Sequence, residues 1–216
     1  MPKFVHLHLH SVFSFLDSTC RLDRLVARAA ELRMSAVAIT DHDGLYGAVR
    51  FYKAAQEVGI KPILGVELTT EGGHHLPLLA TSRAGYANLC RMVTAGHFRV
   101  LREAAGEQEP IAPILNTRAA GAQWRKAPRC NFSTIAKCSG DVIALSGCRF
   151  GEVPAAVRRG DMEAARSAVR RYQDIFGPDR FFIELCREEP GEGERLHISR
   201  LAALAEEMGA PTVATA

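Results

Sequence analysis

Histidines occupy every second position near the start of the chain. His6, His8 and His10 alternate with Leu7 and Leu9. Alternate residues of an extended strand share one face, so this spacing predicts three imidazoles side by side. Buried imidazoles without partners are costly. The pattern therefore favours a metal site over a single histidine that is merely part of a core.

Further side chains that can bind metal stand near the ends of later apolar runs. They are Asp17, the triplet Asp41-His42-Asp43, Glu67 and Cys148. Imidazole, carboxylate and thiolate groups are the ligands that zinc takes in proteins, and manganese shares the nitrogen and oxygen donors. The sequence predicts one metal centre, provided that the fold brings these ends together.

Alternating apolar runs and helix-period segments supply the elements that would position these side chains. Strands are predicted at residues 4–9, 36–40, 61–68, 76–80, 141–146, 181–185 and 211–215, and helices at 22–33, 46–58, 86–97, 153–176 (one or two) and 194–208. Repeated strand-helix units indicate a parallel sheet, and seven strands favour a single α/β domain built as a closed barrel. The carboxyl ends of such strands share one rim, where the predicted ligands would meet. Residues 104–138 are predicted to be an irregular excursion.

The composition excludes several classes of protein. The chain has 216 residues, of which 47% are hydrophobic and 24% charged, with a net charge of +3. These values argue against a disordered or coiled-coil chain. No apolar run reaches the roughly eighteen residues of a membrane span, and histidines stand where an export signal needs an apolar core. We expect a cytoplasmic protein with no membrane partner, whose six cysteines are thiols.

Charge is unevenly distributed along the chain. The segment 91–137 is rich in Lys and Arg, including Arg125, Lys126 and Arg129. Such a segment is either a solvated loop or a surface that attracts the phosphates of a DNA strand.

Six motifs in register resemble one known family. The motifs are HLHLHSVFSFLD, AITDHDGLYGAVRFYKAA, ILGVEL, LLATSRAGYANLCRMV, ALSGCRFGEV and FGPDRFFIEL. In this order and spacing they resemble the polymerase-and-histidinol-phosphatase (PHP) domain. The sequence is most similar to the version found at the N-terminus of bacterial DNA polymerase III α subunits, including their error-prone relatives. The resemblance covers the whole chain, 1–216, except residues 104–138.

The resemblance implies a distorted seven-stranded βα barrel that holds up to three divalent ions, zinc or manganese, and hydrolyses phosphoesters. By motif it implies as metal ligands His8, His10, Asp17, His42, Glu67 and Cys148. It implies that His6 and Asp41 do not bind the metal themselves but lie next to the ligands and orient them. No catalytic residue separate from the metal ligands is expected.

This sequence differs from the family pattern at two places. The ligand expected between Glu67 and Cys148 falls near Ala95, and His97, two positions away, is the predicted ligand. His74 and His75 compete for that role, although a surface turn is their expected setting. The last family motif, Asp-x-His, would begin beyond residue 216. Glu184 stands at a strand end and could reach the rim, but a salt bridge is its expected role.

Three functions follow from this resemblance. The first is a metal-dependent phosphoesterase domain of a DNA polymerase, linked to replication or repair synthesis and to 3′–5′ exonuclease proofreading. Its partners would be DNA, the polymerase body and other replication subunits. The second is a stand-alone phosphomonoesterase of the histidinol-phosphate kind, acting on a small phosphate ester. The third is a non-catalytic structural module of a polymerase. The nucleotidyl-transferring site of a polymerase is absent from these 216 residues.

Overall fold

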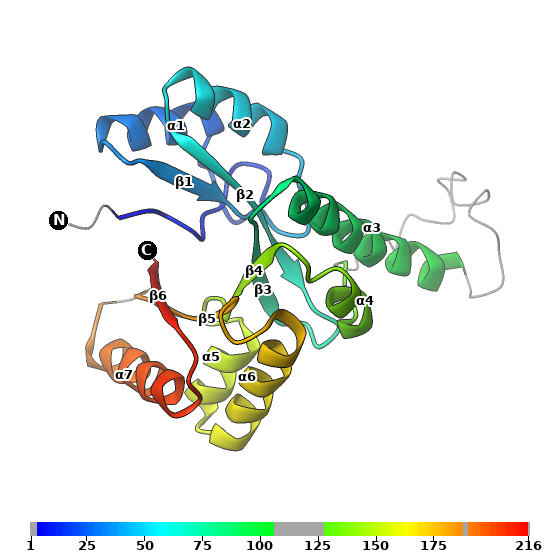
Figure 1. Cartoon of the computed structure of the whole chain (residues 1–216), viewed down its shortest axis with the longest axis vertical. Helices are drawn as coiled ribbons and strands as arrows, with labels where there is room; N and C mark the ends of the chain where they lie inside the picture. The colour runs from blue at the N-terminus through cyan, green and yellow to red at the C-terminus, as the bar shows by residue number, and fades with distance from the viewer. Residues whose placement is uncertain (1–3, 106–127, 188–189, 216) are drawn as a thin grey trace.

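Six strands form one curled sheet whose spatial order is the order of the sequence. The computed structural model describes residues 4–105, 128–187 and 190–215 (Figure 1). The strands are β1 (Ala36–Ile39), β2 (Lys61–Thr69), β3 (His75–Ala80), β4 (Val142–Leu145), β5 (Phe181–Cys186) and β6 (Thr212–Thr215). Each corresponds to a strand predicted from the apolar runs.

The sheet is mixed rather than parallel throughout. β1 and β2 pair in parallel, as do β4 with β5 and β5 with β6, whereas β3 is antiparallel to both of its neighbours. The turn at 70–74 between β2 and β3 is too short for the crossover that a parallel pair needs. The start of β3 therefore lies at the same edge of the sheet as the carboxyl ends of the other strands.

The predicted first strand, residues 4–9, forms no regular ladder and bends at His8. The amide of Ala38 donates to the carbonyl oxygen of His6, and the amide of Thr40 donates to that of Leu9, both at 2.8 Å. Between these two bonds the chain advances by two residues along β1 and its end, but by three along this segment. The extra residue interrupts the pairing as a bulge does. Within the described residues the sheet is a half-barrel of six strands, so the predicted closed barrel of seven strands is not confirmed.

Seven helices of the described chain flank the sheet. They are α1 (Leu22–Glu31), α2 (Ala48–Glu57), α3 (Arg83–Ala105), α4 (Phe132–Lys137), α5 (Glu152–Arg159), α6 (Met162–Phe176) and α7 (Glu192–Glu207). The predicted segment 153–176 is two helices because Gly160, at φ 76°, ends α5 and the Asp161 carboxylate caps α6. The stretch 104–138 contains the end of α3 and all of α4, and residues 106–127 lie outside the described chain.

Two apolar layers hold these elements. α1 and α2 pack against β1 through a buried stripe that includes Leu25 and Phe51. The larger cluster lies between the other strands and α3 to α7, where Tyr172 stacks on Phe181 with ring centroids 5.0 Å apart. In the described parts of the chain, no helix has the length and apolarity that crossing a membrane requires. The core leaves the carboxyl edge of β1 and β2 to polar side chains.

Candidate metal centre

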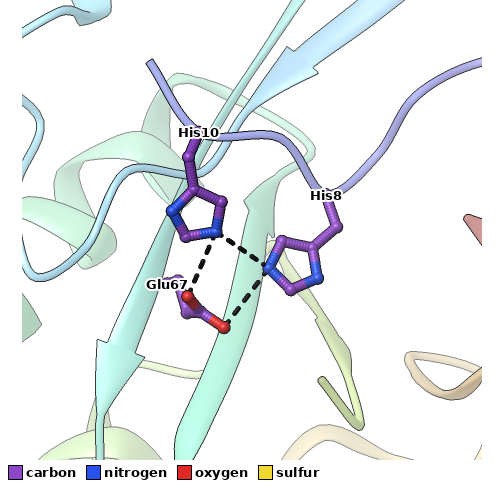
Figure 2. A group of neighbouring side chains, drawn as sticks. All are labelled: His8, His10 and Glu67. Atoms are coloured by element: carbon purple, nitrogen blue, oxygen red, sulfur yellow. Dashed lines mark hydrogen bonds and ion pairs between the residues drawn. The ribbon is translucent and has the colours of Figure 1, made fainter. Parts of the chain in front are cut away.

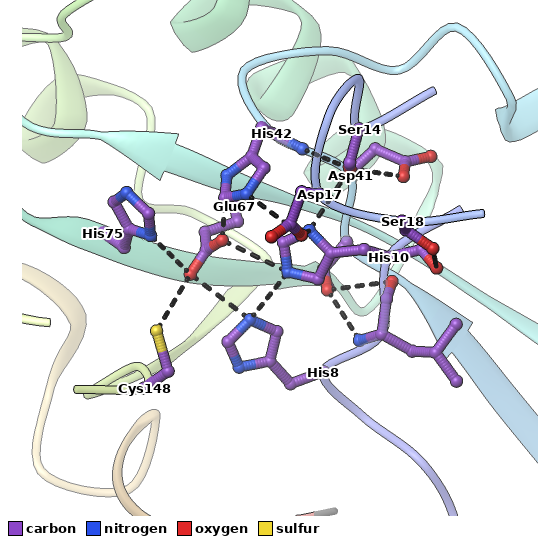
Figure 3. A network of polar contacts seen from close by, with 12 residues as sticks. His8, His10, Ser14, Asp17, Ser18, Asp41, His42, Glu67, His75 and Cys148 are labelled. Atoms are coloured by element: carbon purple, nitrogen blue, oxygen red, sulfur yellow. Dashed lines mark hydrogen bonds and ion pairs between the residues drawn. The ribbon is translucent and has the colours of Figure 1, made fainter. Parts of the chain in front are cut away.

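Glu67 is the centre of a cluster of imidazoles (Figure 3). It lies near the end of β2 and is 1% exposed. Its Oε1 is 3.2 Å from His8 Nε2 and 3.3 Å from His75 Nδ1. Its Oε2 is 3.2 Å from His10 Nε2 and 3.0 Å from His42 Nδ1. One buried carboxylate is therefore shared by four histidines from three parts of the sequence.

Asp17 and Cys148 border this cluster. The Asp17 carboxylate, half exposed, lies 3.3 Å from His10 Nδ1 and 3.5 Å from His42 Nε2. The Cys148 thiol lies on the other side, with Sγ 3.9 Å from Glu67 Oε1. Cys148 follows β4, so it comes from the strand edge that the sequence predicted.

The turn that carries Cys148 needs a glycine before it. Gly147 has a φ of 84°, a conformation that L side chains rarely adopt. A Cβ atom at this position would also lie 3.0 Å from the carbonyl oxygen of His75. Gly147 thus allows the turn after β4 to approach the start of β3 closely.

The electrostatics of the cluster favour positive charge. Burial by itself raises the pKa of the Glu67 carboxyl, but the close imidazoles of His10, His42, His75 and His8 hold this pKa well below its ordinary value. Burial disfavours charge on His8, yet its hydrogen bonds to Glu184 and Glu67 raise its pKa to about 10. Burial likewise opposes charge on His42, and Glu67 again raises the pKa. The cluster holds an ionised carboxylate among groups that stabilise a cation.

His10 is oriented by a hydroxyl and a buried aspartate. Ser14 Oγ donates to Asp41 Oδ1 at 2.7 Å, because a carboxylate only accepts. The same oxygen therefore accepts from His10 Nδ1, 3.2 Å away. The other neighbour of Nδ1 is the Asp17 carboxylate, which is also an acceptor. His10 Nδ1 thus carries the proton, and Nε2 presents a lone pair toward Glu67.

His8 is oriented in the same sense. Its Nδ1 donates to Glu184 Oε1 at 2.9 Å, which leaves Nε2 to face the cluster. Nε2 of His8 and Nε2 of His10 are 3.2 Å apart and both approach Glu67 (Figure 2). Facing nitrogen atoms and carboxylate oxygens repel unless a proton or a metal ion lies between them. A metal ion and a proton therefore compete for the His8 lone pair.

Two buried atoms of the cluster support a metal over a purely structural role. Glu67 Oε2 and His75 Nδ1 make no well-formed hydrogen bond within the described chain, although each lies close to an ion-pair partner. Buried polar atoms are normally hydrogen-bonded. Their donor types, one carboxylate oxygen and one imidazole nitrogen, fit a divalent metal.

The potential ligand atoms fall into three overlapping groups, each with atoms within 4.8 Å of one another. The groups are His8, His10 and Glu67; His10, Asp17 and His42; and His42, Glu67 and His75. Because neighbouring groups share a residue, the arrangement suits a cluster of ions better than one isolated ion.

The structure brings together six predicted ligands: His8, His10, Asp17, His42, Glu67 and Cys148. It places His97 elsewhere, with Nε2 donating to the carbonyl oxygen of Asp43 at 2.8 Å. His97 belongs to none of the three groups, and His75 takes a place among them. The prediction that His75 lies in a surface turn away from the site is wrong, because His75 begins the antiparallel strand β3.

The two residues predicted to support the ligands differ. Asp41 accepts from the Ser11 amide, the Ser11 hydroxyl and the Ser14 hydroxyl, so it acts on His10 through Ser14. His6 does not share a face with His10. It lines a cleft of about 320 Å³ beneath α1 together with Leu9, because the bulge breaks the predicted alternation.

Sequence reasoning also assigned Glu184 only a salt bridge. Glu184 is 1% exposed on β5 and contacts His8 directly. Its position on an inner strand beside the first histidine segment could have been found only from the curvature of the sheet. Of the basic segment, Arg125 and Lys126 lie outside the described residues, and Arg129 donates to the carbonyl oxygen of Glu71 at 3.2 Å.

Comparison with known proteins identifies similar sequences and folds. The family model described as PHP domain matches residues 6–188. The chain is 46% identical over 213 residues to an error-prone DNA polymerase of Symbiobacterium thermophilum, covering 99% of this chain and 19% of that protein. It is 36% identical over 221 residues to the DNA polymerase III subunit alpha of Escherichia coli, covering 99% of this chain and 17% of that protein. The chain therefore spans less than a fifth of the length of these relatives.

Two solved structures share the fold. One is a candidate metal-dependent phosphoesterase from Bifidobacterium adolescentis, with a TM-score of 0.57 and 18% identity over 100% of this chain and 87% of that one. The other is an amidohydrolase from Chromobacterium violaceum, with a TM-score of 0.60 and 18% identity over 98% of this chain and 86% of that one.

Proposed function

This chain belongs to the PHP domain family, and from that premise we propose that it is a metal-dependent phosphoesterase acting on DNA within a larger polymerase. The observation that carries the proposal is the set of three overlapping ligand groups around Glu67. We propose further that residues 1–216 form one such domain in the cytoplasm. Its partners would be the polymerase body, other replication subunits and DNA.

The ligands divide into inner and outer positions. His8, His10 and Glu67 would hold one ion in the buried part of the cluster, with Cys148 next to Glu67. His42 and His75 would hold a second ion with Glu67, and Asp17 lies on the solvent side of the cluster beside His10 and His42. We propose zinc or manganese, because the donors include nitrogen, oxygen and sulfur.

Bound divalent ions would supply an activated water at neutral pH and neutralise the charge on the phosphate oxygens. The residues of the chain prepare the site for this chemistry. Asp41 and Ser14 keep the proton of His10 on Nδ1. Asp17, half exposed, lies on the solvent side of the cluster beside His10. Glu67 stays ionised because four imidazoles surround it.

The border of the cluster favours a nucleic acid over a small monoester. Phe150 is 54% exposed, and its ring centroid lies 5.3 Å from that of His75. The Arg149 guanidinium lies 5.1 Å from the centroid of the Phe150 ring. An exposed aromatic ring beside a cation is the arrangement on which unpaired bases and their phosphates bind.

The test compares the 216-residue chain with the double variant His8→Ala/His10→Ala in Mn²⁺ or Zn²⁺. Substrates are single-stranded DNA with a free 3′ end and p-nitrophenyl phosphate, a small monoester. We expect release of nucleotides by the wild-type chain only. Equal rates for both chains would refute the proposal.

Two other outcomes identify the alternatives. Hydrolysis of the small monoester without DNA cleavage would indicate a stand-alone phosphatase. Tight metal binding without turnover of either substrate would indicate a structural module.

A further inference from the structure

Glu184 lies behind the metal centre and has no role in the function proposed above. We propose that Glu184 is a positioning residue for His8: it holds the proton of His8 on Nδ1 and so aims Nε2 at the metal position. This inference rests on the proposed metal site and adds a residue outside the ligand set. Its first support is that Glu184 contacts none of the other ligands of the three groups in the interactions observed.

The surroundings of Glu184 are those of a buried acceptor. Its side chain is fully buried on β5. Oε1 accepts from His8 Nδ1 at 2.9 Å and from the Thr215 hydroxyl on β6. The Glu184 amide donates to Ser146 Oγ at 2.9 Å, which fixes the backbone against the end of β4. Two neighbouring strands therefore determine where this carboxylate points.

An ordinary salt bridge does not explain Glu184. Within the described residues its only ion-pair partner is His8, and no Lys or Arg contacts it. His8 lies between Glu184 and Glu67, so even a protonated His8 supplies one positive charge for two buried carboxylates. Burying a carboxylate without a full counter-charge is expensive. A cation bound in the cluster would offset this cost. Glu184 interacts with the cluster through its hydrogen bond to the ring of His8.

The chemistry of imidazole explains how Glu184 acts at a distance. A neutral imidazole has one protonated and one unprotonated nitrogen, so an acceptor at Nδ1 leaves the lone pair on Nε2. A carboxylate at Nδ1 also makes Nε2 more basic and fixes the plane of the ring. Loss of such a partner typically weakens metal binding by about 10- to 100-fold.

The backbone around His8 makes this support necessary. His8 lies at a bend in the segment whose pairing with β1 is interrupted between His6 and Leu9. Regular backbone hydrogen bonds therefore do not fix the position of His8. The contact with Glu184 ties this segment to β5, on the opposite side of the open half-barrel.

The experiment measures zinc binding by isothermal titration with the metal-free 216-residue chain and its variants Glu184→Ala and Glu184→Gln. We expect Glu184→Ala to weaken zinc binding by about 10- to 100-fold. Glu184→Gln keeps an oxygen acceptor for Nδ1, so its loss should be smaller. The control is Glu194→Gln, which alters a buried glutamate of α7 far from the cluster and should bind zinc as the wild type does.

A second readout separates positioning from simple loss of stability. In the zinc-loaded chain labelled with ¹⁵N-histidine, the wild type should show a protonated Nδ1 on His8 and a zinc-shifted Nε2. Glu184→Ala should lose the protected Nδ1 proton, and Glu184→Gln should keep it while shifting the Nε2 resonance. Should Glu184→Ala not fold, the Glu184→Gln spectrum still decides the matter.

The outcomes distinguish this inference from the function on which it rests. Absence of zinc binding by the wild-type chain would overturn both. Zinc binding of wild-type strength by both Glu184 variants, with unchanged His8 resonances, would overturn the positioning role alone and leave the phosphoesterase proposal intact.

Discussion

Glu67 in the sheet and Glu194 in α7 are both buried, but the negative charges of their carboxylates are compensated by different kinds of side chain. Glu194 is 7% exposed, and both of its oxygens accept from Arg158 Nη2, at 3.0 and 2.9 Å. Glu67 is 1% exposed and is surrounded by imidazoles. Arginine is always charged and only donates, so its pair with Glu194 is complete. Histidine also brings a lone pair, so a bound cation would complete the cluster around Glu67.

A similar pairing holds the helical layer elsewhere. The carboxylate of Glu152 on α5 accepts from Arg171 and, at 2.9 Å, from the Tyr172 hydroxyl of α6. Burial, followed by the charge of Glu152, raises the pKa of Tyr172, so its hydroxyl remains a donor. The helical layer therefore uses its buried charges to fasten helices, whereas the strand edge uses them to build a site.

The sharpest way to break this comparison is to neutralise Glu67. At a metal concentration of about 100 times the dissociation constant, binding stabilises the folded state by about 2.7 kcal/mol. We expect Mn²⁺ to raise the thermal unfolding temperature of the wild type and to leave Glu67→Gln almost unchanged. Thermal unfolding with and without Mn²⁺ measures the effect. If Mn²⁺ raised the unfolding temperature of Glu67→Gln as much as that of the wild type, Glu67 would not be a metal ligand.

Adjacent histidines provide a second test of the cluster. His75 lies within 3.3 Å of Glu67 Oε1, whereas its neighbour His74 is in none of the ligand groups. We expect His75→Ala to weaken metal binding by at least about 10-fold, and His74→Ala to leave it unchanged. His97→Ala should have a smaller effect than His75→Ala, because its Nε2 is bonded to Asp43. Isothermal titration ranks the three variants, and a larger loss for His97→Ala would reverse the assignment.

The third test concerns the helical layer. Glu194→Gln removes the charge that faces Arg158, whose side chain is 36% exposed. Because solvent can reach this arginine, we expect a loss of about 1–2 kcal/mol rather than the larger cost of a fully buried pair. Urea unfolding measures the change, and metal affinity should remain at the wild-type value. A change in metal affinity would mean that the two regions are coupled.

The smallest expected effect is a pH dependence in the same layer. Burial and then the positive charge of Arg158 lower the pKa of His197 below its ordinary value of 6.5. The unfolded chain binds this proton more readily, so stability rises with pH between the lowered pKa and about 6.5. His197→Gln should make the free energy of unfolding less dependent on pH in this window. Urea unfolding between pH 5 and about 7.5 checks it, and an unchanged slope would contradict it.

Much of the centre could be predicted because its ligands stand where strands end. His42 and Cys148 each follow an apolar run, and in parallel strands such ends share an edge. Glu67 lies inside β2, but its neighbour His42 bridges to it in parallel. Residue type and spacing were enough to predict these neighbours.

The positions of His75, His6 and Glu184 were not predicted, because they depend on how the strands pair. The local pattern of apolar and polar residues does not reveal strand pairing. His75 is the first residue of β3, and it reaches the cluster because β3 is antiparallel to β2. His6 leaves the shared face because one extra residue interrupts the first segment. Glu184 meets His8 through the curvature of the sheet, over a separation of 176 residues.

That separation also gives the centre an order of assembly during synthesis. A ribosome makes the segment with His8 and His10 first, Glu67 later, and Glu184 only when most of the described chain has been made. Domains generally fold as units. The early histidines therefore lack their buried carboxylate partners until those strands have been made, and the full set of contacts to His8 requires β5. Firm retention of metal would therefore mark a chain whose sheet is finished.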